Sequence, residues 1–129
     1  MDIEKRLENL KYFETTIRSK QHERNRLGSL IAQNVANEPY KGFSAEVNRK
    51  YRTQCDEIEK EIEELGKERA ELIRLIDMLD PFESAILRLF YVEAKTWKTI
   101  EYMLRGRKRN FQRIKRGAIR KLNAITNIK

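Results

Sequence analysis

The sequence predicts an all-α protein in which two long helices precede a C-terminal module of three shorter helices. The 129 residues include only five glycines and two prolines, whereas 37% of the residues are charged. Such a composition is rich in helix formers and poor in turn formers. Apolar residues recur at spacings of three and four along most of the chain, which is the period of an amphipathic helix. Together these observations argue against sandwiches, barrels and disulfide scaffolds.

The first helix is expected over about residues 2–35. Its apolar stripe follows a heptad that polar residues interrupt, and it consists of Ile3, Leu7, Leu10, Ile17, Ile31 and Val35. The segment 36–43 contains Pro39 and Gly42, both of which are expected to break the helix. Because this segment is short, it allows the next helix to fold back on the first.

Residues 44–79 carry the strongest periodicity in the chain and predict a second long helix. Ser44 is the expected N-cap, and Pro81 disfavours the helical conformation of Asp80 and so ends the run. Steps of four and three residues give a coiled-coil seam. Apart from Arg69, the seam residues are Tyr51, Cys55, Ile58, Ile62, Leu65, Leu72, Ile76 and Leu79.

Residues 1–79 are therefore predicted to form one region, an antiparallel helical hairpin or coiled coil. Two helices alone leave much of their apolar seam exposed to water. We therefore expect the seam residues to mediate assembly into a homo-oligomer, either a dimer or a tetramer. The alternative is a monomer whose hairpin docks on its own C-terminal module.

Residues 80–129 are predicted to form a separate module of three helices. Asp80 caps a first helix that Pro81 leads, and Thr96 caps a second helix. A tight turn around Gly106 connects the second helix to a third, over about residues 108–125. The apolar residues expected in the small core are Phe82, Ala85, Ile86, Leu89, Phe90, Trp97, Ile100, Met103, Leu104, Phe111, Ile114, Ala118, Ile119, Leu122 and Ile125.

The positive charge of the chain is concentrated in this module. The formal net charge is +8, yet residues 80–129 alone carry 13 basic and 4 acidic side chains, and residues 105–121 carry nine basic and none acidic. A short helix, a turn with glycine and a longer basic helix make a helix-turn-helix, whose second helix enters the major groove of double-stranded DNA. The predicted DNA-binding residues are Arg105, Arg107, Lys108, Arg109, Asn110, Gln112, Arg113, Lys115, Arg116, Arg120 and Lys121.

The spacing of these segments resembles region 4 of bacterial sigma-70 factors. Thr96, Trp97 and Ile100 match its second helix, and Phe111, Ala118 and Leu122 match its recognition helix, over about 45 residues. With a coiled coil in front, the chain is similar to RinA- and ArpU-like late-gene activators of phages. The resemblance implies DNA binding and transcription regulation, with bacterial RNA polymerase as a candidate partner. Arg105 and Gly106 depart from the usual turn residues.

Other functions are weakly indicated by the sequence. The chain has one cysteine, Cys55, and one histidine, His22, so we expect no disulfide, no metal site, no cofactor and no catalytic centre. No apolar run is long enough to cross a membrane, which favours a cytoplasmic protein without a membrane partner. Two alternatives remain: a DNA-packaging recognition protein of the small-terminase kind, and a structural or RNA-binding coiled coil.

Overall fold

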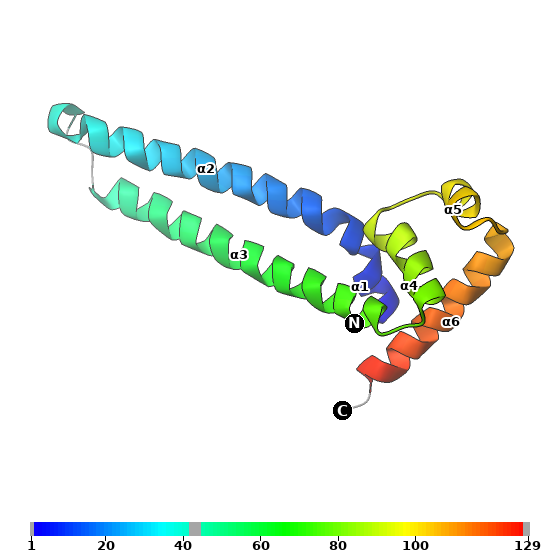
Figure 1. The fold of residues 1–129 in the computed structure, drawn as a ribbon. Coiled ribbons are helices and arrows are strands. Elements are labelled where there is room, and N and C mark those ends of the chain that lie inside the picture. Colours follow the sequence, from blue (N-terminus) through cyan, green and yellow to red (C-terminus); the bar gives the residue numbers. More distant parts are fainter. Residues whose placement is uncertain (1, 42–44, 128–129) are drawn as a thin grey trace. The chain divides into compact units, whose positions relative to one another are not determined.

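The computed structural model describes residues 2–41 and 45–127, and all regular elements within these ranges are helical (Figure 1). This confirms the all-α prediction. The elements are α1 (Ile3–Glu8), α2 (Leu10–Lys41), α3 (Ala45–Asp77), α4 (Pro81–Leu87), the π-helical turn η1 (Arg88–Val92), α5 (Trp97–Leu104) and α6 (Lys108–Thr126). Among the described residues, no helix is both long enough and apolar enough to span a membrane.

The chain divides into two compact units. Unit 1 comprises Met1–Phe13 and Glu68–Lys129, and unit 2 comprises Glu14–Lys67. The boundary between them falls within α2 and within α3. The C-terminal module expected over residues 80–129 therefore shares its compact unit with the start of the chain and with the end of α3.

Unit 2 consists of the parts of α2 and α3 that run side by side in opposite directions (Figure 1). Lys20 pairs with Glu61, Arg24 pairs with Glu59, and the amide of Asn34 donates to Asn48 at 3.1 Å. The partner numbers on α3 fall as those on α2 rise, which is the order expected for antiparallel helices. Leu27, 2% exposed, is the only fully buried apolar side chain among the described residues of this unit.

Unit 1 contains the main hydrophobic core. Its buried side chains come from the first ten residues, the end of α3, the α4–η1 segment and the second half of α6, and they are Ile3, Leu7, Leu10, Leu72, Leu75, Ile76, Leu79, Leu87, Tyr91, Ala118, Ile119 and Leu122. A second, smaller cluster joins α4, η1, α5 and the start of α6 through Ile86, Leu89, Ile100 and Phe111. The two clusters bury opposite ends of α6.

Helix α1 is fastened to the rest of unit 1 by polar contacts as well as by its apolar face. The Arg6 guanidinium donates to both carboxylate oxygens of Glu68, at 2.7 and 3.1 Å, and to Glu71 at 3.3 Å. The hydrogen bond that Arg6 donates to Glu68 raises the pKa of Arg6 above its ordinary value. The backbone amide of Ile3 donates to the side chain of Asn123 on α6 at 3.4 Å. The N-terminal residues are thus part of the module that contains α6.

The first long helix differs from the prediction at both ends. It is interrupted at Asn9, whose backbone amide closes α1 by donating to carbonyl oxygens of Arg6 and Leu7, and α2 then runs to Lys41 rather than ending near Val35. The expectation that Pro39 breaks the helix was wrong. Proline removes one backbone hydrogen bond, but its fixed φ is compatible with a helical backbone. Gly42 and Ser44 lie outside the described residues.

The predicted starts of the C-terminal helices are confirmed at Pro81, Trp97 and Lys108. Two side chains expected in the core are exposed instead: Phe82, 47% exposed, and Met103. Trp97 is half-buried and stacks on Phe90, with ring centroids 4.7 Å apart, and Phe111 is buried. These two aromatic rings therefore belong to the small core, as predicted.

The predicted seam is shared between the two units. Tyr51, Cys55, Ile58, Ile62 and Leu65 lie on the part of α3 in unit 2 and are half-buried. Leu72, Ile76 and Leu79 are buried in the core of unit 1 within this one chain. Within one chain, the seam residues from Tyr51 to Leu65 are therefore only half-buried, unlike those from Leu72 to Leu79.

Candidate nucleic-acid interface

The connection between α5 and α6 has a defined backbone geometry. Thr96 begins α5 by accepting a hydrogen bond from the Thr99 amide at 3.2 Å. Arg105 ends the helix with φ 52° and ψ 63°, a left-handed conformation that residues other than glycine rarely adopt. Residues 105–107 then lead into α6 at Lys108. Two helices are thus joined by three residues.

Gly106 is required in this turn by packing rather than by a left-handed backbone. A Cβ atom at this position would lie about 3 Å from two ring carbons of Phe111, Cε1 and Cε2, and closer still to Cζ. The positive φ belongs to its neighbour, Arg105. The tight turn expected around Gly106 is present over residues 105–107, and the close approach of the Phe111 ring explains the glycine at its centre.

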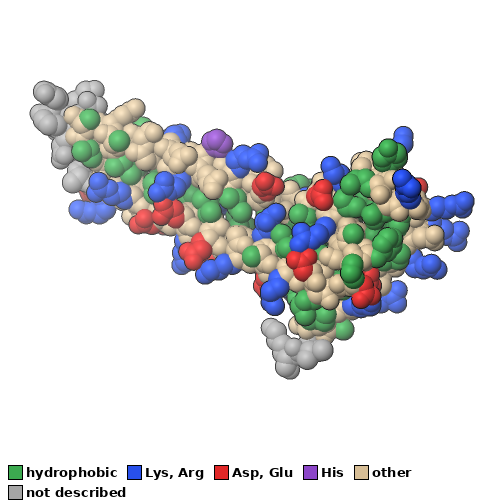
Figure 2. All heavy atoms as spheres, in the orientation of Figure 1, with side chains coloured by type: hydrophobic (Ala, Val, Ile, Leu, Met, Phe, Trp, Pro, Cys, Tyr) green, Lys and Arg blue, Asp and Glu red, His purple; other side chains and the backbone are tan. Residues whose placement is uncertain are grey.

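Four arginines form a stripe along the side of α6 that faces away from the core. Arg109, Arg113, Arg116 and Arg120 are separated by four, three and four residues, which places them on one face over about 16 Å of helix. All four are exposed, and none forms an ion pair within the described residues. We call this set the arginine stripe. Figure 2 shows Lys and Arg side chains projecting from the part of unit 1 that contains α5 and α6.

The other predicted residues near the start of α6 surround this stripe. Arg105 and Arg107 in the turn are exposed, as are Lys108 and Asn110 in the first turn of α6. Gln112 is half-buried. Arg and Lys neutralise phosphates, and Arg, Asn and Gln can each form two hydrogen bonds with the edge of a base. The groups suited to both kinds of contact therefore gather at one end of α6.

Two predicted DNA-binding lysines already have partners inside unit 1. The ammonium of Lys121 donates to Glu83 at 3.0 Å and lies 3.8 Å from Asp80. The hydrogen bond with Glu83 raises the pKa of Lys121. The ammonium of Lys115 lies 4.7 Å from the centre of the Phe90 ring. These lysines are less available to DNA than the arginine stripe.

Helix α5 adds two exposed residues that the sequence reasoning did not select. Tyr102, 85% exposed, lies four residues after Lys98 and three before Arg105, so the three side chains share one side of α5. A lysine and a tyrosine on a predicted amphipathic helix were visible in the sequence. The missing information was which side of α5 the small core would leave exposed.

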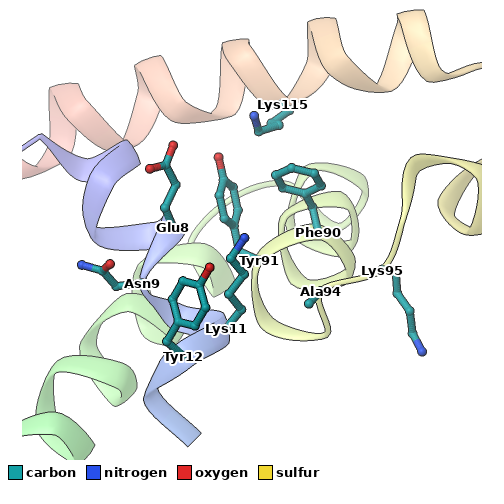
Figure 3. A pocket seen from close by; sticks show the side chains of 9 residues that line it. All are labelled: Glu8, Asn9, Lys11, Tyr12, Phe90, Tyr91, Ala94, Lys95 and Lys115. Atoms are coloured by element: carbon teal, nitrogen blue, oxygen red, sulfur yellow. The ribbon is translucent and has the colours of Figure 1, made fainter. Parts of the chain in front are cut away.

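A cavity of about 400 Å³ lies on another side of unit 1, lined by α1, the start of α2, η1 and α6 (Figure 3). Tyr91 contributes a side chain that is 3% exposed, and its hydroxyl has no hydrogen-bond partner among the described residues. Burial raises the pKa of this hydroxyl, which stays protonated. In the part of the chain that the structure describes, no group of His, Cys, Asp and Glu side chains is placed to hold a metal ion.

Comparison with known proteins identifies a family for this chain. Residues 42–123, more than half of the chain, match the family described as a protein of unknown function, DUF1492. The match includes all of α3, α4, η1 and α5, and most of α6. No curated protein and no solved structure shows significant similarity to the chain. The protein belongs to the DUF1492 family.

Proposed function

We propose that this protein is a sequence-specific, double-stranded DNA-binding regulator of transcription. In this proposal α5 and α6 act as a helix-turn-helix, α6 enters the major groove, and unit 2 joins copies of the chain. The resemblance to sigma-70 region 4 and to phage late-gene activators favours a role at phage late promoters, with bacterial RNA polymerase as a candidate partner.

The arginine stripe is the observation that carries the proposal. The major groove of DNA is about 12 Å wide and admits an α-helix. A helix in the groove has phosphates on both sides and base edges in front of it. The face of the helix that points away from the protein core must therefore carry cationic and hydrogen-bonding side chains. The outward face of α6 carries Arg109, Arg113, Arg116 and Arg120, and the described part of the chain offers these arginines no carboxylate partner.

The connection between the two helices supports the same arrangement. In a helix-turn-helix, a short turn and a shared core hold the recognition helix at a fixed angle to the helix before it. Here the turn is three residues long, and Phe111 and Ile100 share the small core that joins α5 to α6. The close approach of the Phe111 ring to Gly106 holds the start of α6 against the turn. Asn110 and Arg113 are then the residues best placed to read bases.

The poor burial of unit 2 supports oligomerisation. A unit of two helices with Leu27 as the one fully buried apolar side chain among its described residues gains little hydrophobic stabilisation by itself. The half-buried segment from Tyr51 to Leu65 provides apolar surface for another copy of the chain. Two copies would place two recognition helices on one DNA duplex, as regulators that bind repeated half-sites do.

The test is the salt dependence of binding to a mixed-sequence duplex. We expect the affinity to fall steeply as the salt concentration rises. Arginines that bind phosphates displace the counterions of the DNA, and a high salt concentration opposes that release. Arg116→Ala should lower the affinity and reduce the slope of log K against log salt by about one. Arg52→Ala, an exposed arginine on α3, is the matched control and should leave both unchanged. Equal slopes for the wild type and Arg116→Ala would contradict the assignment of α6.

A further inference from the structure

The cavity beside Tyr91 has features that DNA binding does not explain. Its lining includes the aromatic rings of Tyr12, Phe90 and Tyr91 and the ammonium groups of Lys11 and Lys115 (Figure 3). Glu8 is the one acidic side chain among the residues that line it. The volume of about 400 Å³ falls within the range of about 300–1000 Å³ that small-molecule sites occupy.

Three polar groups of the cavity form neither a hydrogen bond nor an ion pair with the described residues. The Tyr91 hydroxyl points toward the space between Glu8 and Lys115 (Figure 3), and no described atom accepts its hydrogen bond. Lys115 faces the rings of Phe90 and Tyr91, at 4.7 and 5.4 Å from their centres, and Lys11 lies 5.2 Å from the centre of the Tyr12 ring. In the described part of the chain neither ammonium forms an ion pair. A buried hydroxyl without a hydrogen-bond partner and two ammonium groups without a carboxylate partner therefore lie at the cavity.

The backbone that forms one wall of the cavity is irregular. The π-helical turn η1 carries Phe90 and Tyr91, and its last hydrogen bond runs from the Glu93 amide to the Arg88 carbonyl. Ala94 follows with φ 54°, a left-handed conformation in a residue with a side chain. Single π-helical turns and strained residues occur frequently at binding sites, where they aim side chains that a regular helix would direct elsewhere.

We propose that this cavity binds a small organic anion with a flat aromatic ring, of the size of a nucleoside monophosphate. The ring of Tyr12 would stack against the aromatic part of the ligand. Lys11 and Lys115 would bind its anionic group, and Tyr91 would donate a hydrogen bond to it. The proposal goes beyond DNA binding and does not depend on it.

The position of Lys115 separates this site from the arginine stripe. At about 100° per residue, Lys115 lies more than about 120° around α6 from the middle of the stripe. A ligand in the cavity would therefore contact α6 on a flank that is not needed for the proposed DNA contacts. Through Lys115, such a ligand would contact α6, the helix that is proposed to bind DNA.

The experiment is calorimetric titration of the full-length protein, without DNA, using adenosine monophosphate as the probe. Inorganic phosphate and adenosine form the two comparison arms, since each carries one half of the proposed chemistry. We expect saturable binding of the monophosphate and much weaker binding of phosphate or adenosine alone. Absence of saturable monophosphate binding at millimolar concentration, or equal binding of phosphate, would overturn the proposal.

Substitutions in the cavity and in the arginine stripe show where the probe binds. Lys115→Gln should weaken it on the order of tenfold, and Tyr91→Phe should weaken it without lowering the melting temperature, because the lost hydroxyl has no partner in the chain. Lys60→Gln, an exposed lysine on α3, is the matched control. The double substitution Arg113→Ala with Arg116→Ala should leave the binding unchanged. Loss in that variant would mean that the probe binds the arginine stripe, which would overturn the cavity while leaving the DNA proposal intact.

Discussion

The ring of Phe111 lies so close to the α-carbon of Gly106 that no side chain fits between them. A Cβ at Gly106 would lie 3.0 Å from Cε1 and 3.1 Å from Cε2 of the ring, closer than such atoms normally approach. Phe111 is also part of the small core that joins α5 and α6. One pair of residues therefore connects the conformation of the turn to the packing of the candidate recognition helix.

Gly106→Ala should destabilise unit 1, because the added methyl group forces the Phe111 ring out of the small core. The expected cost is about 1–3 kcal/mol, as for other overpacked sites. Urea denaturation followed through the fluorescence of Trp97, the only tryptophan in the chain, measures it. Gly117→Ala is the matched control: a Cβ there meets no atom within 4 Å, so we expect stabilisation of about 0.5–1 kcal/mol. Equal effects of the two substitutions would contradict the packing role of Gly106.

Leu7→Ala should destabilise the module that contains α6, although the two lie at opposite ends of the sequence. Leu7 is fully buried in the core that includes Ala118 and Leu122, so its truncation should cost about 2–5 kcal/mol. The free energy of unfolding from urea titration gives the value. Met78→Ala, an exposed apolar residue of the same unit, should change it by less than about 0.5 kcal/mol. An unfolding transition of the Trp97 signal unaffected by Leu7→Ala would show that the N-terminal residues are not part of this core.

Lys121 should contribute to the stability of unit 1 more than to DNA binding. Its ammonium is held by Glu83, whose carboxylate also accepts a hydrogen bond from the Asp80 amide at the start of α4. The pKa of Lys121 is raised in the folded state. Its stabilising effect is therefore fully present below its ordinary pKa of 10.5 and is lost as the pH rises through the higher folded-state value.

This predicts that Lys121→Met lowers the melting temperature at neutral pH, and that the difference from the wild type shrinks at strongly alkaline pH. It also predicts a smaller loss of DNA affinity for Lys121→Met than for Arg120→Met, because Lys121 pairs with Glu83 whereas Arg120 belongs to the stripe and has no ion-pair partner among the described residues. Thermal melts across pH and duplex titrations measure the two effects. A larger loss of affinity in the Lys121 variant would contradict this assignment.

Ile62→Asp should reduce the oligomeric state. Ile62 lies in the middle of the half-buried segment from Tyr51 to Leu65, and a carboxylate there would be desolvated in an interface between chains. Light scattering should give at least twice the chain mass of 15.5 kDa for the wild type and a lower mass for the variant. Glu57→Gln, on the exposed side of α3, serves as the control. A wild-type protein that is monomeric at every concentration would contradict assembly through this segment.

Much of the fold was predictable because the sequence carries strong local signals. The heptad spacing from Tyr51 onward predicted α3, and Asp80 with Pro81 and Thr96 predicted the starts of α4 and α5. The interruption at Asn9 was not predictable, since the segment around it contains neither glycine nor proline, and Leu7 and Leu10 on either side of it both lie in the shared core. The continuation of α2 through Pro39 likewise depends on a backbone that tolerates the loss of one hydrogen bond.

The basic residues of the candidate interface could be predicted from the sequence. Which of them pair with a carboxylate within the chain could not. Arg116 and Lys121 are both exposed basic residues of α6, yet only Lys121 pairs with a carboxylate, that of Glu83 on α4. The same holds for Tyr91, whose isolation in a cavity arises from residues of α1, η1 and α6 that are distant in sequence. Local sequence patterns predict which residues lie on one face of a helix. Tertiary contacts decide which of these residues form ion pairs or hydrogen bonds within the chain.

Selection from a random duplex library with the purified full-length protein tests specific recognition of double-stranded DNA most directly. At about 150 mM salt, where phosphate contacts alone bind weakly, we expect enrichment of a defined motif that is read by the start of α6. Repeated half-sites are expected if unit 2 joins two copies, and Arg113→Ala should relax the preference at a single base position. Salt-sensitive binding without any enriched motif would contradict the claim of specific recognition.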